Sequence, residues 1–259
     1  MDYVPIWQAL KWLFYYCFFA ILISTILPNP LQKNKDIMNT EDFIEFESKN
    51  YSEEEVERKS LEFLEDLSKR RSVRDFAERE VFKEVIENLI KTAGLAPSGA
   101  NKQPWTFCVI SNKQLKKEIR RLAEIEEYEN YHVRMSDSWK QDLKHLGTNY
   151  IKEFLDIAPY LIVVFKKVYD VDKDGGRAQN YYVNESVGIA CGFLIAAIHQ
   201  AGLVTLTHTP SPMAFLHKAL NRPKNEKAFL LLPVGYPATD CKVPNIQKKE
   251  FEEICHWYD

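Results

Sequence analysis

The segment at residues 180–203, NYYVNESVGIACGFLIAAIHQAGL, places the strongest constraint on the fold. It has helical spacing, yet apolar side chains occupy nearly every side of the helix. A helix without a polar face is buried, either within a core or against another subunit. Because 46% of the 259 residues are hydrophobic, the chain can bury such a core in one domain.

Helical and strand patterns alternate around that segment. Helical periodicity marks residues 80–97 and 112–135, and strands are expected at 105–111, 159–168, 203–210 and 228–237. This order predicts an α+β fold in which a mixed central sheet packs against the long buried helix.

The N-terminal part is a separate unit. Residues 7–27, WQALKWLFYYCFFAILISTIL, are long and apolar enough to cross a bilayer as one helix. A cleaved signal peptide is the alternative, but no basic region precedes the segment and no small-x-small site follows it. We expect a tail at 1–6, a transmembrane anchor at 7–27, a polar linker at 28–60 and a globular domain at 61–259. The lysines just after the anchor predict that this domain faces the cytosol.

One short run is strongly basic although the chain carries a net charge of -3. Residues 68–76, SKRRSVRDF, suit a small anion, or they form a solvated basic turn, since a nucleic-acid-binding protein needs a basic face across much of the domain. No phosphate-loop or dinucleotide motif accompanies the run, and no histidines stand at metal-ligand spacing, so we expect no metal site. The five cysteines form no C-x-x-C pair, which predicts reduced thiols.

Four segments in order carry a family resemblance: RRSVRDF at 70–76, APSGANKQPW at 96–105, THTP at 207–210 and LLPVGYP at 231–237. Together they resemble the FMN-dependent nitroreductase superfamily, from about residue 60 to the C-terminus. Within it, the N-terminal span and the segments EEYENYHVRM and NYIKEF are similar to membrane-anchored reductive dehalogenases of halotyrosines. The resemblance implies a nitroreductase-like, FMN-binding α+β fold preceded by one transmembrane helix.

A family of this kind implies an FMN site. FMN carries a phosphate dianion, which forked guanidinium donors suit better than lysines do. By the resemblance, the cofactor contacts are Arg70, Arg71, Ser72, Val73, Arg74, Pro97, Ser98, Gly99, Thr207, His208 and Thr209. Lys248 stands where the family usually has an arginine that completes the phosphate clamp, and it offers a point charge in place of a fork.

Thr209 is the catalytic residue that the resemblance implies. Its hydroxyl would donate to flavin N5, and a neutral donor there favours the release of electrons one at a time. Single-electron transfer suits the reductive loss of a halide. The structural alternative is that Thr209 is an ordinary β-branched strand residue.

A charged lid is expected to select the substrate. Glu127 and Tyr131 are four residues apart, which places both on one face of a helix, and Lys152 follows on NYIKEF. By the resemblance, Glu127 takes the α-ammonium of a halotyrosine, and Tyr131 and Lys152 take its carboxylate. The backbone N–H of Ala100 holds the phenolate. The alternative is a charged, exposed helix. We expect the lid to be mobile when empty and ordered when filled.

The resemblance as a whole implies an FMN-dependent dehalogenase of iodinated tyrosines, with bromo- and chlorotyrosine as further substrates. It implies an intertwined homodimer with the flavin between subunits, and a separate reductase that passes on electrons from NADPH. One alternative is a general nitroreductase that acts on quinones, nitroaromatics or flavins. Another is a non-catalytic flavoprotein subunit that regulates a membrane partner.

Overall fold

The computed structural model describes residues 43–259, so the predicted tail and anchor lie outside the described residues. Within residues 43–259, no helix is long and apolar enough to cross a membrane. The four cysteines in this range are all free. The compact unit that carries the fold spans Glu57–Asp259, and residues 43–52 before it contain no helix or strand.

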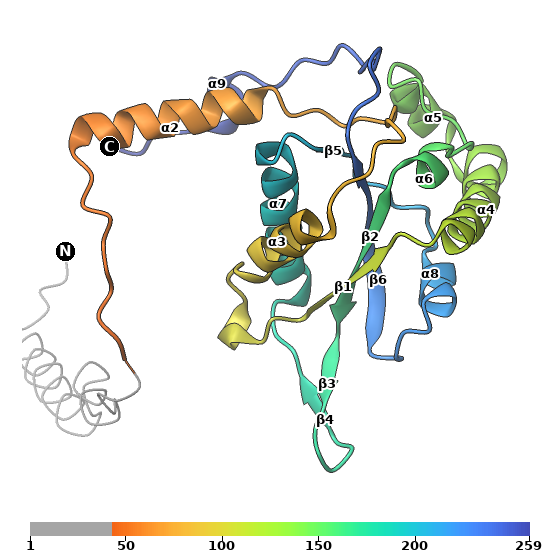
Figure 1. Cartoon of the computed structure of the whole chain (residues 1–259), viewed down its shortest axis with the longest axis horizontal. Helices are drawn as coiled ribbons and strands as arrows, with labels where there is room; N and C mark the ends of the chain where they lie inside the picture. Colours follow the sequence, from red (N-terminus) through yellow and green to blue (C-terminus); the bar gives the residue numbers. More distant parts are fainter. Residues whose placement is uncertain (1–42) are drawn as a thin grey trace, which may run out of the picture. The chain divides into compact units, whose positions relative to one another are not determined.

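A four-stranded sheet forms the centre of the fold (Figure 1). Its strands are β1 (Trp105–Ile110), β2 (Tyr160–Lys167), β6 (Glu226–Gly235) and β5 (Val204–Thr205), in that spatial order. Every pair of neighbouring strands is antiparallel. The central strands β2 and β6 are rich in Leu, Ile and Val, and most of their residues are buried, as a sheet covered on both faces requires.

Helices cover the two faces of the sheet and divide the core into two clusters. The first cluster includes residues of α3 (Lys83–Gly94) and α7 (Val183–Gln200) together with Ile162 and Val164. The second includes residues of α4 (Lys113–Glu129), α6 (Phe154–Ile157) and α8 (Ala214–Ala219) together with Leu161, Val163 and Phe165. Successive side chains of β2 therefore alternate between the clusters, as strand geometry dictates.

Smaller elements complete the chain. They are α2 (Glu53–Ser68), η2 (Gly99–Asn101), the π-helix η3 (Asn130–Arg134), α5 (Asp137–Lys144), the hairpin of β3 (Tyr169–Val171) and β4 (Arg177–Gln179), and α9 (Phe251–Ile254). Helix α2 begins inside the stretch that we expected to be linker, and none of its residues is buried.

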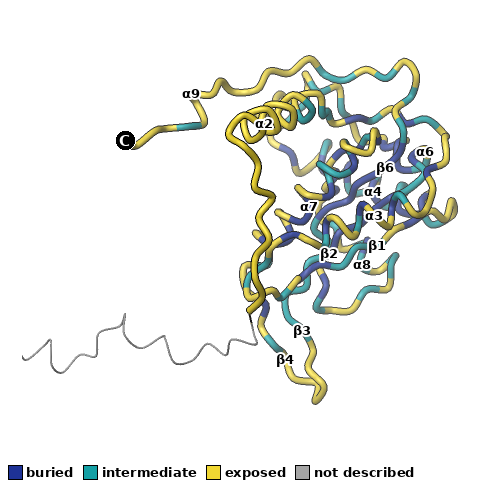
Figure 2. The backbone as a smooth tube through the Cα atoms, turned by 60° about the vertical axis from the view of Figure 1, so that its left-hand side comes forward, coloured by how far each residue is buried: buried dark blue, intermediate teal, exposed yellow. Residues whose placement is uncertain are grey.

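The expected long helix is α7, but only one of its sides is covered. Val187, Ala190 and Leu194 are completely buried, whereas the side chains of Ile189 and Phe193 are 43% and 41% exposed. In Figure 2, where the tube is coloured by the burial of each residue, α7 carries both buried and exposed residues. The single chain thus covers one side of this apolar helix and leaves apolar side chains on the other side exposed.

Two expectations about the sheet need correction. The strand predicted at 203–210 is reduced to the two residues of β5, because the chain then leaves the sheet and returns at one isolated bridge between His208 and Leu231. The sheet that we expected to be mixed is antiparallel in its named strands. Within the described residues its parallel pairing is confined to a bridge between Ser72 and Thr205.

Candidate functional site

The basic run enters the fold at the edge of the sheet. The N–H of Val73 donates to the carbonyl of Thr205 at 3.1 Å, and Ser72 forms the parallel bridge to the same residue. This extended attachment buries Val73 and Phe76, so the arginines between α2 and the sheet are held on a fixed backbone. The solvated turn that we weighed as an alternative does not describe such a segment.

The arginines face two separate cavities. Arg70 and Arg71 line a cavity of about 170 Å³ whose wall includes Ile198 of α7. Arg71 also donates a hydrogen bond to the carbonyl of Pro244 in the C-terminal segment. Arg74 instead lines a cavity of about 490 Å³ beside the loop before α6. The predicted cluster therefore divides into a small pocket lined by Arg70 and Arg71, here called the basic pocket, and a single cation, Arg74, beside the lid.

Lys248 is exposed, and within residues 43–259 no hydrogen bond or ion pair joins it to the arginines. The contact of Arg71 with Pro244 brings the C-terminal segment close to the basic pocket, but it does not place the Lys248 ammonium there. Its role in the phosphate clamp stays a prediction.

The turn after α3 is built from unusual backbone conformations. Ala100, Asn101 and Gln103 all have positive φ, close to +50°. Residues other than glycine rarely adopt this conformation, and such strain is concentrated at ligand-binding sites. Ser98 supports the turn by accepting a hydrogen bond from the N–H of Gln103 at 2.9 Å. A side chain at Gly99 would approach Tyr182 to 2.9 Å, which explains the glycine.

The THTP segment presents alternate side chains to different surroundings. Thr207 and Thr209 are exposed, whereas His208 is 7% exposed and its ring meets the Phe154 ring edge-on, with centroids 5.5 Å apart. Two backbone hydrogen bonds with Leu231 fix the position of His208. The Thr209 hydroxyl is therefore free to reach a ligand, while the His208 ring belongs to the packing below the lid.

Three of the four predicted substrate residues, Glu127, Tyr131 and Lys152, meet in the folded chain. The Lys152 ammonium lies 3.1 Å from a carboxylate oxygen of Glu127 and 5.6 Å from the centre of the Tyr131 ring. Glu127 is 7% and Lys152 3% exposed, so the charged, exposed helix that we considered is wrong at this position. Glu127 lies in the last turn of α4, which ends at Glu129, and Tyr131 follows inside the π-helix η3. Single π-turns of this kind are frequent at functional sites.

Electrostatics connect the clamp with Arg74. Burial lowers the pKa of Lys152, and the neighbouring Glu127 carboxylate opposes that shift. Burial raises the pKa of Tyr131, against the effect of its hydrogen bond with Thr148. Burial, assisted by the positive charges of Lys152 and Arg74, lowers the pKa of His208 to about 3, so its ring is neutral at physiological pH. The Nε2 atom of this ring is buried without a hydrogen-bond partner.

Sequence reasoning missed the residues that support the clamp. Glu124 accepts a hydrogen bond from the N–H of Lys152 at 2.8 Å, and Arg120 binds both Glu124 and Asp156. The spacing of Arg120 and Glu124 at i,i+4 signalled an ion pair, but nothing local indicated that it would reach a segment about thirty residues further along the chain.

The comparisons with known proteins agree with this geometry. Residues 67–236 match the nitroreductase family. The iodotyrosine deiodinase of Haliscomenobacter hydrossis is 58% identical over 208 residues, which cover 80% of this chain and 94% of that protein. Iodotyrosine deiodinase 1 of Homo sapiens is 48% identical over 212 residues, with 82% of this chain and 73% of that protein covered.

Solved structures extend the likeness to three dimensions. A crystal structure of oxidised iodotyrosine deiodinase bound to FMN and 3-iodo-L-tyrosine matches with a TM-score of 0.66 at 30% identity, covering 76% of this chain and 99% of that one. A nitroreductase from Bacteroides fragilis with bound FMN shares the fold, with a TM-score of 0.57 at 17% identity. The chain belongs to the nitroreductase family and, within it, to the iodotyrosine deiodinases.

Proposed function

We propose that the protein reductively dehalogenates halotyrosines with FMN as its cofactor. The buried pair of Glu127 and Lys152 beside Tyr131 is the observation that carries the proposal. A free amino acid presents an ammonium and a carboxylate a few ångströms apart, and this pair offers one partner of the right charge for each. Relatives that are named iodotyrosine deiodinases, one of them solved with FMN and 3-iodo-L-tyrosine, support the same substrate class.

The described residues fit FMN. Arg70 and Arg71 line the smaller cavity together with Lys69, which concentrates positive charge where a phosphate dianion would bind. The strained turn at Ala100 and Asn101 follows Gly99, and backbone conformations of this kind are concentrated at ligand-binding sites. In this arrangement Arg70 and Arg71 would hold the phosphate and the exposed Thr209 hydroxyl would hydrogen-bond the ring. Lys248 is proposed to complete the clamp.

Bound FMN in its reduced form would supply two electrons, and with one proton these would replace the aromatic carbon–halogen bond by carbon–hydrogen and release halide. The protein's own part is to orient the amino acid and exclude water. Glu127 would bind the ammonium group on the substrate's α-carbon, and Lys152 would bind the carboxylate group. Ala100 would donate its N–H to the phenolate, and the lid would exclude water from the site. The Phe154 ring of α6 packs edge-on against His208.

A substrate comparison tests the proposal. Full-length, FMN-loaded protein reduced with dithionite is given iodo-, bromo- and chlorotyrosine, and halide release is measured against 2-iodophenol, which lacks the zwitterion. We expect kcat/KM for iodotyrosine to exceed that for iodophenol by at least tenfold, and the Glu127→Gln variant to lose most of this preference. Equal use of both substrates would make the protein a general nitroreductase or quinone reductase.

Three further proposals concern its assembly. The uncovered apolar side of α7, with Ile189 and Phe193, is proposed to be the interface of an intertwined homodimer in which both subunits contribute to each flavin site. Residues 7–27 are proposed to anchor the protein in a membrane as a single helix, with the catalytic domain in the cytosol. A separate NADPH-dependent reductase is proposed to supply the electrons. Chemical cross-linking, membrane extraction and protease protection test the first two proposals.

A further inference from the structure

Helix α4 contacts the segment from residue 152 to residue 158 through a row of charged side chains that the substrate clamp does not use. The row consists of Lys116, Arg120 and Glu124, which stand at i, i+4 and i+8 and so share one face of the helix. We call these three residues the α4 ladder. Each of them reaches the same segment of the chain, which begins at Lys152 and ends at Ala158.

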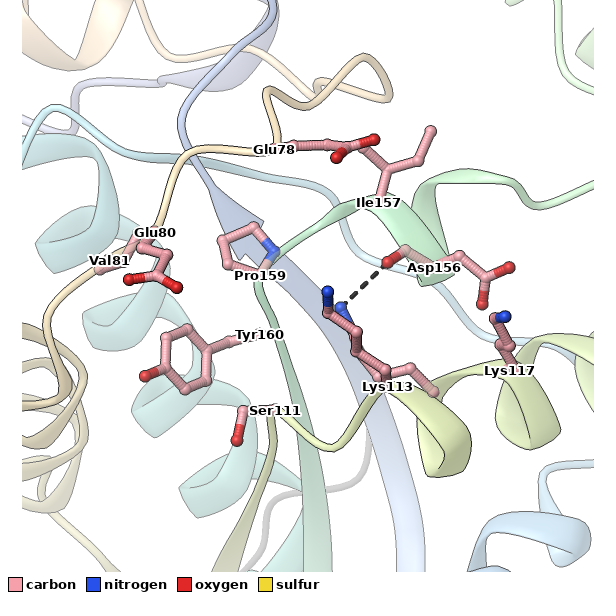
Figure 3. Close-up of a pocket in the computed structure, with 11 residues that line it drawn as sticks. Glu78, Glu80, Val81, Ser111, Lys113, Lys117, Asp156, Ile157, Pro159 and Tyr160 are labelled. Atoms are coloured by element: carbon pink, nitrogen blue, oxygen red, sulfur yellow. Dashed lines mark hydrogen bonds between the residues drawn. The ribbon is translucent and has the colours of Figure 1, made fainter.

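The outer end of the ladder is a buried ammonium. Lys116 is 4% exposed, and its Nζ donates to the carbonyls of Asp156 at 2.9 Å and of Ala158 at 2.6 Å. These carbonyls lie at the C-terminal end of α6 and on the residue after it, where a cation satisfies acceptors that no helical N–H reaches. Figure 3 shows the bond to the Asp156 carbonyl, at the wall of a cavity of about 490 Å³.

The middle and inner positions continue the connection toward the clamp. Arg120 binds the Asp156 carboxylate at 2.9 Å and Glu124 at 2.8 Å. Glu124 uses the same oxygen to accept the backbone N–H of Lys152 at 2.8 Å. The ladder therefore contacts the 152–158 segment at both ends. Its inner contact, from Glu124, is to the backbone N–H of Lys152, whose side chain pairs with Glu127.

We propose that the α4 ladder consists of positioning residues that set the specificity of the site for zwitterionic substrates. Apart from Glu127, the Lys152 ammonium donates to the Asn149 carbonyl and the Thr148 hydroxyl, which lie in the same loop as Lys152. Those two bonds place the ammonium within its own loop, but they do not fix that loop relative to α4. By holding the Lys152 backbone to the same helix that carries Glu127, Glu124 keeps the two charged groups at a set separation. This role rests on the proposed function, because it presumes that the pair receives the substrate's ammonium and carboxylate.

The apolar contacts of the same elements explain why the ladder acts on position. Ile119 and Ala123 of α4 and Leu155 of α6 are completely buried in one core cluster. These residues hold α6 against α4 whether or not the ladder is intact. Loss of Glu124 should therefore displace the backbone at Lys152 without unfolding the lid. If Glu124 were needed only for folding, its loss would lower the activities toward iodotyrosine and benzoquinone equally.

The experiment compares Glu124→Ala and Glu124→Gln in full-length, FMN-loaded protein, with Glu118→Ala as the matched control. Glu118 is on the same helix but pairs with Arg121 in solvent. Three quantities are measured: the Kd for 3-iodotyrosine by calorimetry, the hydrogen-exchange rate of the Lys152 amide, and kcat/KM for iodotyrosine relative to benzoquinone.

For Glu124→Ala we expect a Kd at least tenfold higher, faster exchange at the Lys152 amide, and at least a tenfold fall in the iodotyrosine-to-benzoquinone ratio. Glu124→Gln keeps an acceptor for that amide and should lie within about threefold of wild type. A Glu124→Ala protein that matches Glu118→Ala in all three measured quantities would refute the proposed role of the ladder but not the proposed function. An equal loss of the iodotyrosine and benzoquinone activities would do the same. A wild-type protein that binds no iodotyrosine would instead refute the proposed function, and this role with it.

Discussion

Replacing Lys152 or Glu127 singly should destabilise the protein far more than replacing both. The two side chains are 4% and 10% exposed, so removing one leaves the other charge nearly dehydrated and without its partner. Breaking a buried ion pair in this way costs about 3–5 kcal/mol, whereas exchange of the whole pair for apolar residues of similar volume is often neutral. We expect Lys152→Met and Glu127→Met each to lower the free energy of unfolding by that amount, and the double variant to remain within about 1 kcal/mol of wild type.

Urea unfolding of the four proteins, each in the same excess of FMN, gives the coupling energy directly. The exposed pair of Arg121 and Glu118 on the same helix is the control, and its double-mutant cycle should show no measurable coupling. Iodotyrosine binding should be lost in all three clamp variants, including the stable double variant, which separates recognition from stability. Additive losses in the clamp cycle would mean that the two charges do not depend on each other, and the reasoning would fail.

Three other changes test neighbouring parts of the site. Arg70→Ala should weaken FMN binding by roughly 1.5–3 kcal/mol, measured by fluorescence titration, and an unchanged Kd would remove Arg70 from the phosphate site. Thr209→Ala should retain FMN but slow halide release, and an equal rate would leave Thr209 a structural residue. The pKa of His208 is held near 3 instead of its ordinary 6.5, so below pH 6.5 the unfolded chain takes up a proton that the folded chain does not. The contribution of the neutral His208 ring to the free energy of unfolding is therefore fully present above pH 6.5. It falls by about 1.4 kcal/mol per pH unit as the pH decreases toward 3. Urea titrations at pH 7 and pH 5 should show that His208→Gln loses less stability than wild type over this interval, by about 2 kcal/mol, and identical losses would contradict the buried neutral ring.

The parts of the fold that follow strong local patterns were predictable. The apolar runs at 159–168 and 228–237 became the central strands β2 and β6, and the periodic stretch at 180–203 became α7. The stretch at 203–210 was predicted too long, because β-branched and apolar residues do not reveal where a chain leaves its sheet. Pairing with β6 ends after Thr205 and resumes only at His208, which is a tertiary outcome.

The candidate site shows the same division. Residues with distinctive chemistry, such as Glu127 and Lys152, were identified from the sequence, and the structure brings them together. Their burial was not predictable, since a stretch with so many charges is typical of an exposed helix. Arg74 was grouped with Arg70 and Arg71 because they are close in sequence, but the structure places Arg74 in a different cavity. The contact between Glu124 and the Lys152 amide depends on packing between segments that no local pattern connects.

The pairing of Glu127 with Lys152 also has a consequence for ligands that carry a single charge. An amine such as iodotyramine could pair with Glu127, but it would leave Lys152 buried without a counterion. A carboxylic acid such as iodophenylpropionate could pair with Lys152, but it would leave Glu127 buried without one. Such a molecule must separate the pair and can compensate only one of its members. A compound with both charges breaks one ion pair and forms two new ones, with Glu127 and with Lys152. The pair therefore favours the binding of amino acids over their decarboxylated or deaminated analogues, before any chemical step.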